Sequence, residues 1–451
     1  MNPSKSTHIP IIGNLPLLRT MLKKFNSEQG RNALSLMLEK VLLLGLGFLF
    51  TMLLARSWSP EVLGEFQYLI ALVALLAPFS ALGLNSLVSR ELVLKRDGTG
   101  QILGTALTLR VMGAAISGLF MAIVGLFLVS PEHQMAFFIL LGAQLAHGFS
   151  VFDFYFESRV QSWVSALLRT CNGFLFMGLK LGWIWWQGSL TGVLMITAVE
   201  WLILAIGWFL VFRLTEKKFF KLSFCFEQAK ALLSRAGWLV LSGIAAVVYL
   251  KIDIVMLGSL ASKAEVAGYS LAARLSEVWY IFPGILAATW FPSLIKAHKE
   301  DHPAYLKRLQ KLCDLLAWCA IAIAIIMTLI AKPLMRLVFG DIYYEAGGIL
   351  QIHIWAAVFI FMRALFSKWI LVEDITKYSL ITHGAGAIMN LVLNLWWIPL
   401  WGGQGAAMAT LVSYATASFF ALLPFRKTRP FAVLMAKSLI LPIRVMFERA
   451  R

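Results

Sequence analysis

The residues of this chain that could do chemistry are ionisable side chains embedded in long apolar segments. A charge in hydrocarbon is costly, so each should face an ionic partner or a water-filled cavity. In such a place a cation could bind an anionic group, and a carboxylate could hold a proton or a metal cation. The set comprises Glu39, Lys40, Arg110, Asp153, Arg169, Lys180, Glu200, Lys251, Asp253, Arg274, Glu277, Arg363 and Lys368, with His353, His383, Asn390 and Asn394 adding polarity.

Two neighbouring apolar segments hold the most informative charges. Arg274 and Glu277 are three residues apart and share one helix face. Asp253 lies in the preceding segment at a similar depth, so we expect it to pair with Arg274. The pair is either a structural lock or part of a polar cavity, in which Arg274 meets an anionic substrate and a carboxylate carries a coupling ion. Arg110, Asp153, Lys180 and Lys368 lie near segment ends, where long side chains can reach the interface.

The composition shows what kind of chain must position these residues. Of 451 residues, 60% are hydrophobic and 14% are charged, and the mean hydropathy is +0.79. Soluble proteins carry roughly 25% charged residues. The composition therefore excludes a soluble enzyme, a secreted disulfide scaffold, a coiled coil and a disordered chain. We expect an all-α polytopic membrane protein whose four unpaired cysteines are packing residues.

Membrane-spanning helices need about 20 predominantly apolar residues. Twelve segments qualify, separated by charged or turn-rich breaks. They are 33–55, 64–89, 103–129, 135–157, 163–186, 190–212, 236–260, 265–293, 313–331, 346–371, 376–400 and 403–425.

The basic residues predict the orientation of these spans. Twelve spans place both termini on one side, and alternate connections carry 28 Lys and Arg on that side against 4 on the other. Because basic loops stay in the cytoplasm, we expect an N-in, C-in protein. The net charge of +17 is then a topology signal and argues against a nucleic-acid partner.

The chain divides into two halves that look related. Residues 61–64 read Glu-Val-Leu-Gly and residues 265–268 read Glu-Val-Ala-Gly, each just after the first span of a half. Two repeats that each contain an even number of spans would have the same orientation in the membrane. We expect an N-tail at 1–32, six-helix bundles at 33–212 and 236–425, a basic cytoplasmic linker at 213–235, and a C-tail at 426–451. Helical spacing of Leu15, Leu18, Leu22 and Phe25, and the interrupted stretch 431–447, suggest interfacial segments.

Motifs of soluble catalysis are missing from the sequence. It contains no GxxxxGK[ST], no HExxH and no GxSxG. We therefore expect a transporter rather than an enzyme, without a cofactor, a metal centre or its own ATP-driven machinery.

Three stretches carry a resemblance to a known family. Residues 53–91 contain Arg56, then Pro-Glu-x-x-Gly-x-Phe and Leu-Gly-Leu-Asn. Residues 253–277 run DIVMLGSLASKAEVAGYSLAARLSE, and residues 383–410 contain Asn390, Asn394, Pro399 and the glycines from Gly402. The chain resembles the O-antigen and exopolysaccharide (Wzx-like) flippases of the multidrug/oligosaccharidyl-lipid/polysaccharide exporter superfamily.

The resemblance implies two six-helix bundles around a central cavity that opens alternately to either side of the bacterial cytoplasmic (inner) membrane. It implies translocation of an undecaprenyl-pyrophosphate-linked oligosaccharide from the inner to the outer leaflet, coupled to H+ or Na+, with a polysaccharide polymerase and chain-length regulator as possible partners. The expected cavity cations are Arg274, Arg363, Arg169, Lys40 and Lys251, of which only Arg274 matches the family motif. The expected coupling or pairing carboxylates are Asp253, Glu277, Glu200 and Glu39, and the polar cavity residues are Asn390, Asn394 and His353.

Other functions remain open at this point. A multidrug antiporter of the same superfamily would also have twelve spans, but it would favour acidic rather than basic cavity residues. A lipid II flippase is related, although that family usually carries fourteen spans. A membrane-embedded polysaccharide polymerase or ligase would typically have a larger outer loop than the one near 331–345.

Overall fold

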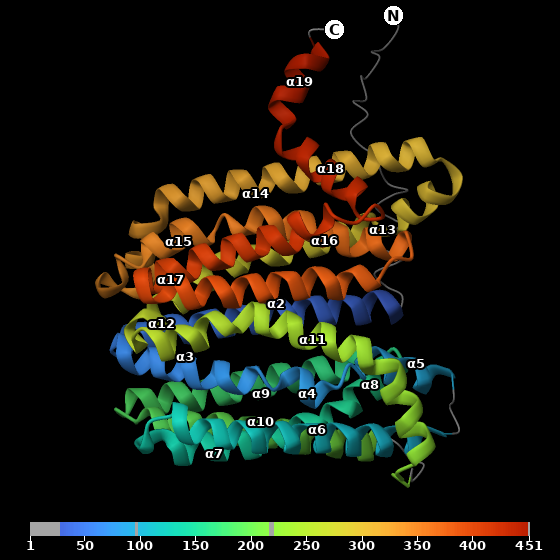
Figure 1. The fold of residues 1–451 in the computed structure, drawn as a ribbon. Coiled ribbons are helices and arrows are strands. Elements are labelled where there is room, and N and C mark those ends of the chain that lie inside the picture. Colours follow the sequence, from blue (N-terminus) through green and yellow to red (C-terminus); the bar gives the residue numbers. More distant parts are fainter. Residues whose placement is uncertain (1–27, 95–97, 216–220, 450–451) are drawn as a thin grey trace, which may run out of the picture.

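Long helices running side by side make up the molecule (Figure 1). The computed structural model describes residues 28–94, 98–215 and 221–449, and every regular element in these ranges is helical. The expected interfacial helix around Leu15 to Phe25 lies outside the described residues. The prediction of an all-helical chain is confirmed.

The first six spans form one lobe, which we call the N-lobe. Several spans are built from two or three helices in line, because proline and strained turns interrupt them; Pro78, for example, follows a break in the second span, which turns again at Leu82 with a φ of 48°. The elements are α2 (Glu28–Ser57), α3 (Pro60–Ala74), α4 (Ala77–Ala81), α5 (Asn85–Leu94), α6 (Thr99–Leu128), α7 (Pro131–Gln144), η2 (Leu145–Ser150), α8 (Val151–Ser158), α9 (Ser162–Trp185) and α10 (Leu190–Thr215).

The remaining spans form the C-lobe, and a short tail follows them. The elements are α11 (Phe226–Leu260), α12 (Lys263–Glu277), η3 (Val278–Tyr280), α13 (Ile281–Glu300), α14 (His302–Phe339), η4 (Asp341–Tyr343), α15 (Gly347–His353), α16 (Ala356–Val372), α17 (Lys377–Ser418), η5 (Phe420–Leu422), α18 (Arg429–Leu439) and α19 (Leu441–Arg449).

Twelve spans emerge from these helices. Within the described residues, ten helical segments are long and apolar enough to cross a membrane. α9 adds a further 24-residue helix, and α17 is two spans because Gly402, with a φ of 52°, breaks it. Gly402 is required there, since a Cβ atom would also meet the Glu265 carboxylate at 3.0 Å. The predicted number of spans is confirmed.

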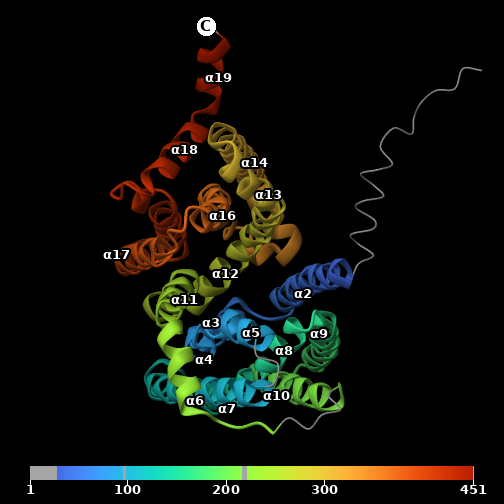
Figure 2. The same ribbon diagram turned by 90° about the vertical axis from the view of Figure 1, so that its right-hand side faces the viewer.

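The lobes meet at the end where α2 finishes and α3 begins, which we call the closed end. There α3 packs against α11 and α12 (Figure 2), and the end of α14 contacts α2. Gly64 lies so close to the Lys263 carbonyl that a Cβ would come within 1.6 Å of its oxygen. Lys263 pairs with Glu65 at 3.0 Å and lies 3.1 Å above the Tyr68 ring. Arg56 donates to the Leu337 and Val338 carbonyls of α14, joining the lobes a second time.

α11 belongs to both lobes. Its first turns bury Ala229, Leu232 and Ala236 among N-lobe side chains, although the sequence predicted a linker up to residue 235. Further along, Tyr249 packs with C-lobe residues. α11 is therefore a continuous connection between the two lobes.

The tail after the last span is split into two short helices. α18 has 11 residues and packs against α14, and α19 has 9 and extends away from the bundle (Figure 1). Each is too short to span hydrocarbon. The interfacial placement of 431–447 stays a prediction.

Candidate functional site

Asp253 lies at the centre of a hydrogen-bond network inside the C-lobe. Its side chain is 2% exposed. Tyr269 and Thr410 each donate a hydroxyl to Asp253 Oδ2 at 2.7 Å, and the Asn394 amide donates to Oδ1. Asn394 also donates to Asn390, which bonds Ser413. The carboxylate therefore receives only neutral donors, from α12 and from both halves of α17.

A small polar cavity adjoins this network where the lobes face each other. The volume of this cavity is about 40 Å³. Gln67 of the N-lobe contributes to its wall, and the C-lobe contributes the rest. The charged residues in the lining are Lys251, Asp253, Arg274 and Glu277, with Tyr269, Ser270, His353 and Tyr414 adding polar groups.

The expected ion pair between Asp253 and Arg274 is not formed, and that prediction is wrong. Hydroxyl and amide donors already occupy the Asp253 oxygens. The Arg274 guanidinium instead reaches the N-lobe helix α2, where a Cβ on Gly47 would lie 2.5 Å from Arg274 Nη2. Within the described chain neither Arg274 nor Lys251 has an ion pair or a hydrogen bond. Arg274 thus crosses the space between the lobes with its charge available.

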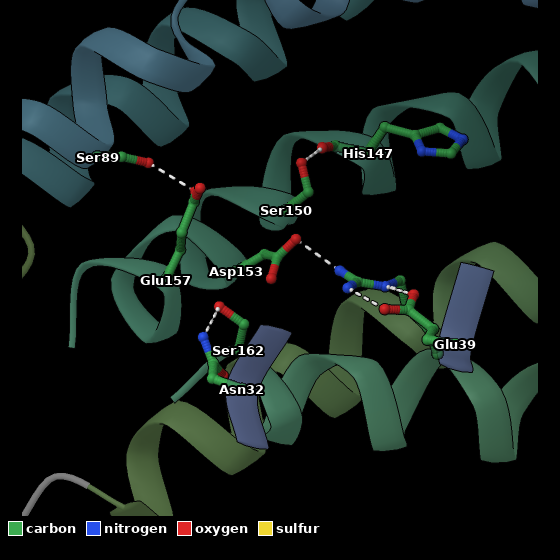
Figure 3. A network of polar contacts seen from close by, with 9 residues as sticks. Asn32, Glu39, Ser89, His147, Ser150, Asp153, Glu157 and Ser162 are labelled. Atoms are coloured by element: carbon green, nitrogen blue, oxygen red, sulfur yellow. Dashed lines mark hydrogen bonds and ion pairs between the residues drawn. The ribbon is translucent and has the colours of Figure 1, made fainter. Parts of the chain in front are cut away.

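The N-lobe cations have partners. Arg169 binds Glu39 with two nitrogen atoms and Asp153 with a third, and these carboxylates come from α2 and α8 (Figure 3). Lys180 pairs with Glu200 at 2.5 Å and lies 5.5 Å from the Phe50 ring centroid. Lys40 is exposed on α2 beside Glu39.

The remaining predicted site residues lie in the C-lobe. Arg363 is 7% exposed and donates to the Ala417 carbonyl near the end of α17 and to Thr382. It does not line the cavity described above. His353 does, and its ring lies 5.7 Å from that of Tyr269. Glu277 lines the same cavity one helical turn from Arg274.

Three members of the Asp253 network were not predicted from the sequence as site residues. Tyr269 and Thr410 lie inside the stretches that carried the family resemblance, but hydroxyl residues in apolar helices have no signal as strong as a charge. Ser413, three residues after Thr410, faces the same side of the helix. Hydroxyl and amide residues that recur every three or four positions, as Asn390 and Asn394 do, lie on one helix face. A search for this spacing would have identified the polar face of the helix.

Comparisons with known proteins agree with this architecture. A family model described as "Polysaccharide biosynthesis protein" matches residues 29–298, more than half of the chain. The chain belongs to this polysaccharide biosynthesis family. Its C-lobe residues 239–396 also match the MatE model, which places the chain in the multidrug/oligosaccharidyl-lipid/polysaccharide exporter superfamily.

One relative of this chain is described as a probable glycan biosynthesis flippase. A probable low-salt glycan biosynthesis flippase, Agl15 of Haloferax volcanii, is 21% identical over 191 residues, which are 42% of this chain and 40% of that protein. The matched region thus spans less than half of that relative's length.

The fold of the family member is similar to those of solved transporters. The lipid II flippase MurJ in an inward closed conformation has a TM-score of 0.68 and 14% identity, covering 92% of each chain. A multidrug resistance MATE transporter in an inward-facing conformation has a TM-score of 0.63 and 15% identity, covering 87% of this chain and 95% of that one. These likenesses show the fold alone.

Proposed function

We propose that this protein is a flippase that moves an undecaprenyl-pyrophosphate-linked oligosaccharide from the inner to the outer leaflet of the bacterial cytoplasmic membrane. The observation that carries the proposal is the unpaired positive charge of Arg274 and Lys251 at a cavity between the lobes. An unpaired cation at such depth is costly unless a ligand or water compensates it. A pyrophosphate headgroup supplies two negative phosphoryl groups for these side chains.

The physical task fits such a cavity. Phosphates and hydrated sugars cannot cross hydrocarbon unaided, because each buried charge and polar group loses its hydration. A polar space between two lobes can shelter the headgroup while the polyprenyl chain stays in lipid. Guanidinium groups match phosphate geometry with paired donors. Arg274 therefore takes the pyrophosphate in our proposal, and Lys251 adds a second charge from α11.

The closed end faces the periplasm in this proposal. The loops at this end carry 4 of the Lys and Arg residues and the opposite connections and tails carry 28, which supports a cytoplasmic location for the opposite end. The described state is then closed to the outside through Lys263 and Arg56. Alternating access would break these contacts and form others at the cytoplasmic end.

Asp253 holds the coupling ion in our proposal. Its buried carboxylate has no cationic side chain as a partner among the described residues, so its charge depends on hydroxyl and amide donors. Binding a proton or Na+ would neutralise it. Because Asp253 and Arg274 line one cavity, ion and substrate can influence each other there.

Reconstitution tests the proposal directly. The purified full chain is placed in proteoliposomes with fluorescent lipid-linked substrates, and transfer between leaflets is measured by protection from a membrane-impermeant quencher. We expect transfer of a polyprenyl-pyrophosphate oligosaccharide under an imposed ion gradient. Transfer of lipid II alone would assign the protein to lipid II flipping, and movement of cationic drugs without either glycolipid would contradict the flippase proposal.

One observation favours the multidrug antiporter as a second candidate. In the N-lobe two carboxylates, Glu39 and Asp153, bind Arg169 together, and a cationic drug could compete with Arg169 for them. The drug arm of the reconstitution experiment decides between the two.

A further inference from the structure

The C-lobe interior contains several buried polar atoms without hydrogen-bond partners. Most buried polar groups in native proteins are hydrogen-bonded to protein or to ordered water. Within the described chain, several buried C-lobe side-chain atoms have no hydrogen-bond partner. These atoms are Asn394 Oδ1, His353 Nδ1, Ser270 Oγ, Tyr249 Oη, His383 Nδ1 and Ser418 Oγ. Leaving each dry would cost free energy, so the group indicates internal water.

The rings of Tyr414, Tyr249 and His383 connect the Asp253 cavity with the cytoplasmic end of the lobe. Tyr414 lines the cavity, and its ring centroid lies 4.4 Å from that of Tyr249. The Tyr249 ring in turn lies 6.2 Å from that of His383. His383 is half-buried and six residues inside α17, roughly 9 Å from the helix end at Lys377. Side chains that carry polar groups therefore follow one another from the Asp253 cavity towards this end of α17.

The backbone makes room for this path at Gly386. A Cβ on Gly386 would lie 3.1 Å from the Tyr249 ring and 2.7 Å from Ala417 Cβ. The missing side chain lets Tyr249, from α11, enter between the two halves of α17. The ring is 2% exposed, but its hydroxyl has no protein partner.

Charged groups flank the path from each packed element. Arg363 of α16 lies near Tyr249, Tyr414 and His383, and Glu277 of α12 lies near Tyr414 and Tyr280. Arg363 binds a carbonyl at the C-terminal end of α17, where the helix dipole is negative. That carbonyl end, with Glu277 and Asp253, offsets the guanidinium charge along the path.

We propose that water molecules along Tyr414, Tyr249 and His383 form a proton path between Asp253 and the cytoplasmic end of α17. The inference rests on the proposed function for the use of Asp253 as the coupling site, and it selects the proton as the coupling ion. The cavity at Asp253 holds only a few waters. A hydrated metal cation needs a wider passage, whereas a proton moves between water, hydroxyl and imidazole groups over hydrogen-bond distances.

Tyr249→Phe gives a sharp test, because it deletes only the unpartnered hydroxyl. In a dry core this change would be neutral or stabilising. In a water path it interrupts the relay. The purified full chain is subjected to a pH jump, and the infrared carbonyl band of protonated Asp253, identified by its loss in Asp253→Asn, is followed in time. We expect Tyr249→Phe to slow the appearance of this band at least about tenfold. His383→Gln should slow it as well, and both variants should keep the melting temperature of the wild type.

A matched control separates the path from a general effect of tyrosine loss. Tyr343 is also buried and has an unpartnered hydroxyl, but it lies at the closed end. Tyr343→Phe should leave the Asp253 band as fast as in the wild type. Equal rates in Tyr249→Phe and the wild type would overturn the path, as would the absence of any protonation of Asp253 between pH 4 and 10 (roughly the range of side-chain titration).

The same readout keeps this inference distinct from the proposed function. Protonation of Asp253 is measured without substrate, so it reports on the path even when no lipid moves. Flipping driven by a Na+ gradient and unaffected by pH would overturn the proton path while supporting the flippase. Fast protonation through Tyr249 in a protein that transfers no glycolipid would support the path and contradict the flippase.

Discussion

The two lobes share a fold, but they handle charge in opposite ways. In the N-lobe, Arg169 and Lys180 each bind carboxylates from neighbouring helices. In the C-lobe, Arg274 has no ion pair or hydrogen bond among the described residues, although Glu277 lies nearby, and Asp253 is held by neutral donors. The N-lobe charges are thus occupied in joining helices. Arg274 and Asp253 of the C-lobe remain available to a substrate and an ion in our proposal.

This difference follows from the energetics of ions in a poorly solvated interior. Removing one partner of a buried pair is strongly destabilising, so a paired group is constrained to its structural role. An unpaired cation already bears its desolvation cost and gains most from an incoming anion. In our proposal the N-lobe ion pairs act as a scaffold, and Arg274 and Asp253 of the C-lobe act on substrate and ion.

The largest effect is expected from Arg274→Ala. Without the guanidinium, the pyrophosphate loses its main charged donor, and charge-assisted hydrogen bonds contribute about 1.5–3 kcal/mol each. Glycolipid transfer in proteoliposomes should fall by at least about tenfold, and Arg274→Lys should recover part of it. Melting temperature should change little, because Arg274 makes no ion pair or hydrogen bond that the substitution would break.

A substitution at Gly47 sharpens this prediction. Gly47→Ala places a methyl group where Arg274 Nη2 now lies, while the charge is retained. Reduced transfer in both variants would show that the position of the guanidinium matters. Normal transfer in Arg274→Ala would mean that the two lobes do not differ in the way we describe.

The next largest effect is expected on stability, from Arg169→Ala. This change leaves Glu39, which is 6% exposed, without a counter-charge between α2 and α9. Breaking a buried pair typically costs about 3–5 kcal/mol, and the partial exposure of Arg169 places the expected loss near the lower end. Thermal unfolding in detergent measures it, and Glu39→Gln in the same chain should restore part of the loss. A stable variant that fails to bind substrate would instead make Arg169 a cavity cation, as the sequence predicted.

Sequence alone predicted the spans because hydrocarbon imposes a length and an apolar composition on each helix. It also placed the breaks, where caps such as Ser59 before Pro60 and Ser262 before Lys263 begin helices. It did not predict how helices are rotated, and that rotation decides which polar groups meet. Arg274 therefore faces α2 rather than Asp253, and Thr410, 157 residues away, donates to Asp253.

Arg363→Gln should produce a smaller loss of stability. Arg363 joins the two halves of α17, since it binds the Ala417 carbonyl at 2.6 Å and the Thr382 hydroxyl at 3.2 Å. Losing a charge-assisted bond to a buried carbonyl costs about 2 kcal/mol. Substrate affinity, measured by titration calorimetry, should stay within about twofold, because Arg363 does not line the interlobe cavity. A large affinity loss at unchanged stability would return Arg363 to the set of substrate cations.

The smallest effect concerns the contact between the lobes rather than either lobe itself. Lys263→Met keeps the aliphatic stem but removes the ion pair with Glu65 and the contact with the Tyr68 ring. For a partly exposed pair, together with a cation–π contact, we expect a loss of about 1 kcal/mol in the free energy of lobe contact. This corresponds to roughly a fivefold decrease in the equilibrium constant for the state in which the lobes meet at the closed end. Spin labels at Ser57 and Ala261, in a chain without its four cysteines, would report the separation of the lobes.

Lys332→Met is the control, because Lys332 pairs with Glu345 inside the C-lobe, and it should leave the distances unchanged. Identical distance distributions in both variants would mean that backbone packing at Gly64 and the Arg56 contacts hold the lobes together without help from Lys263.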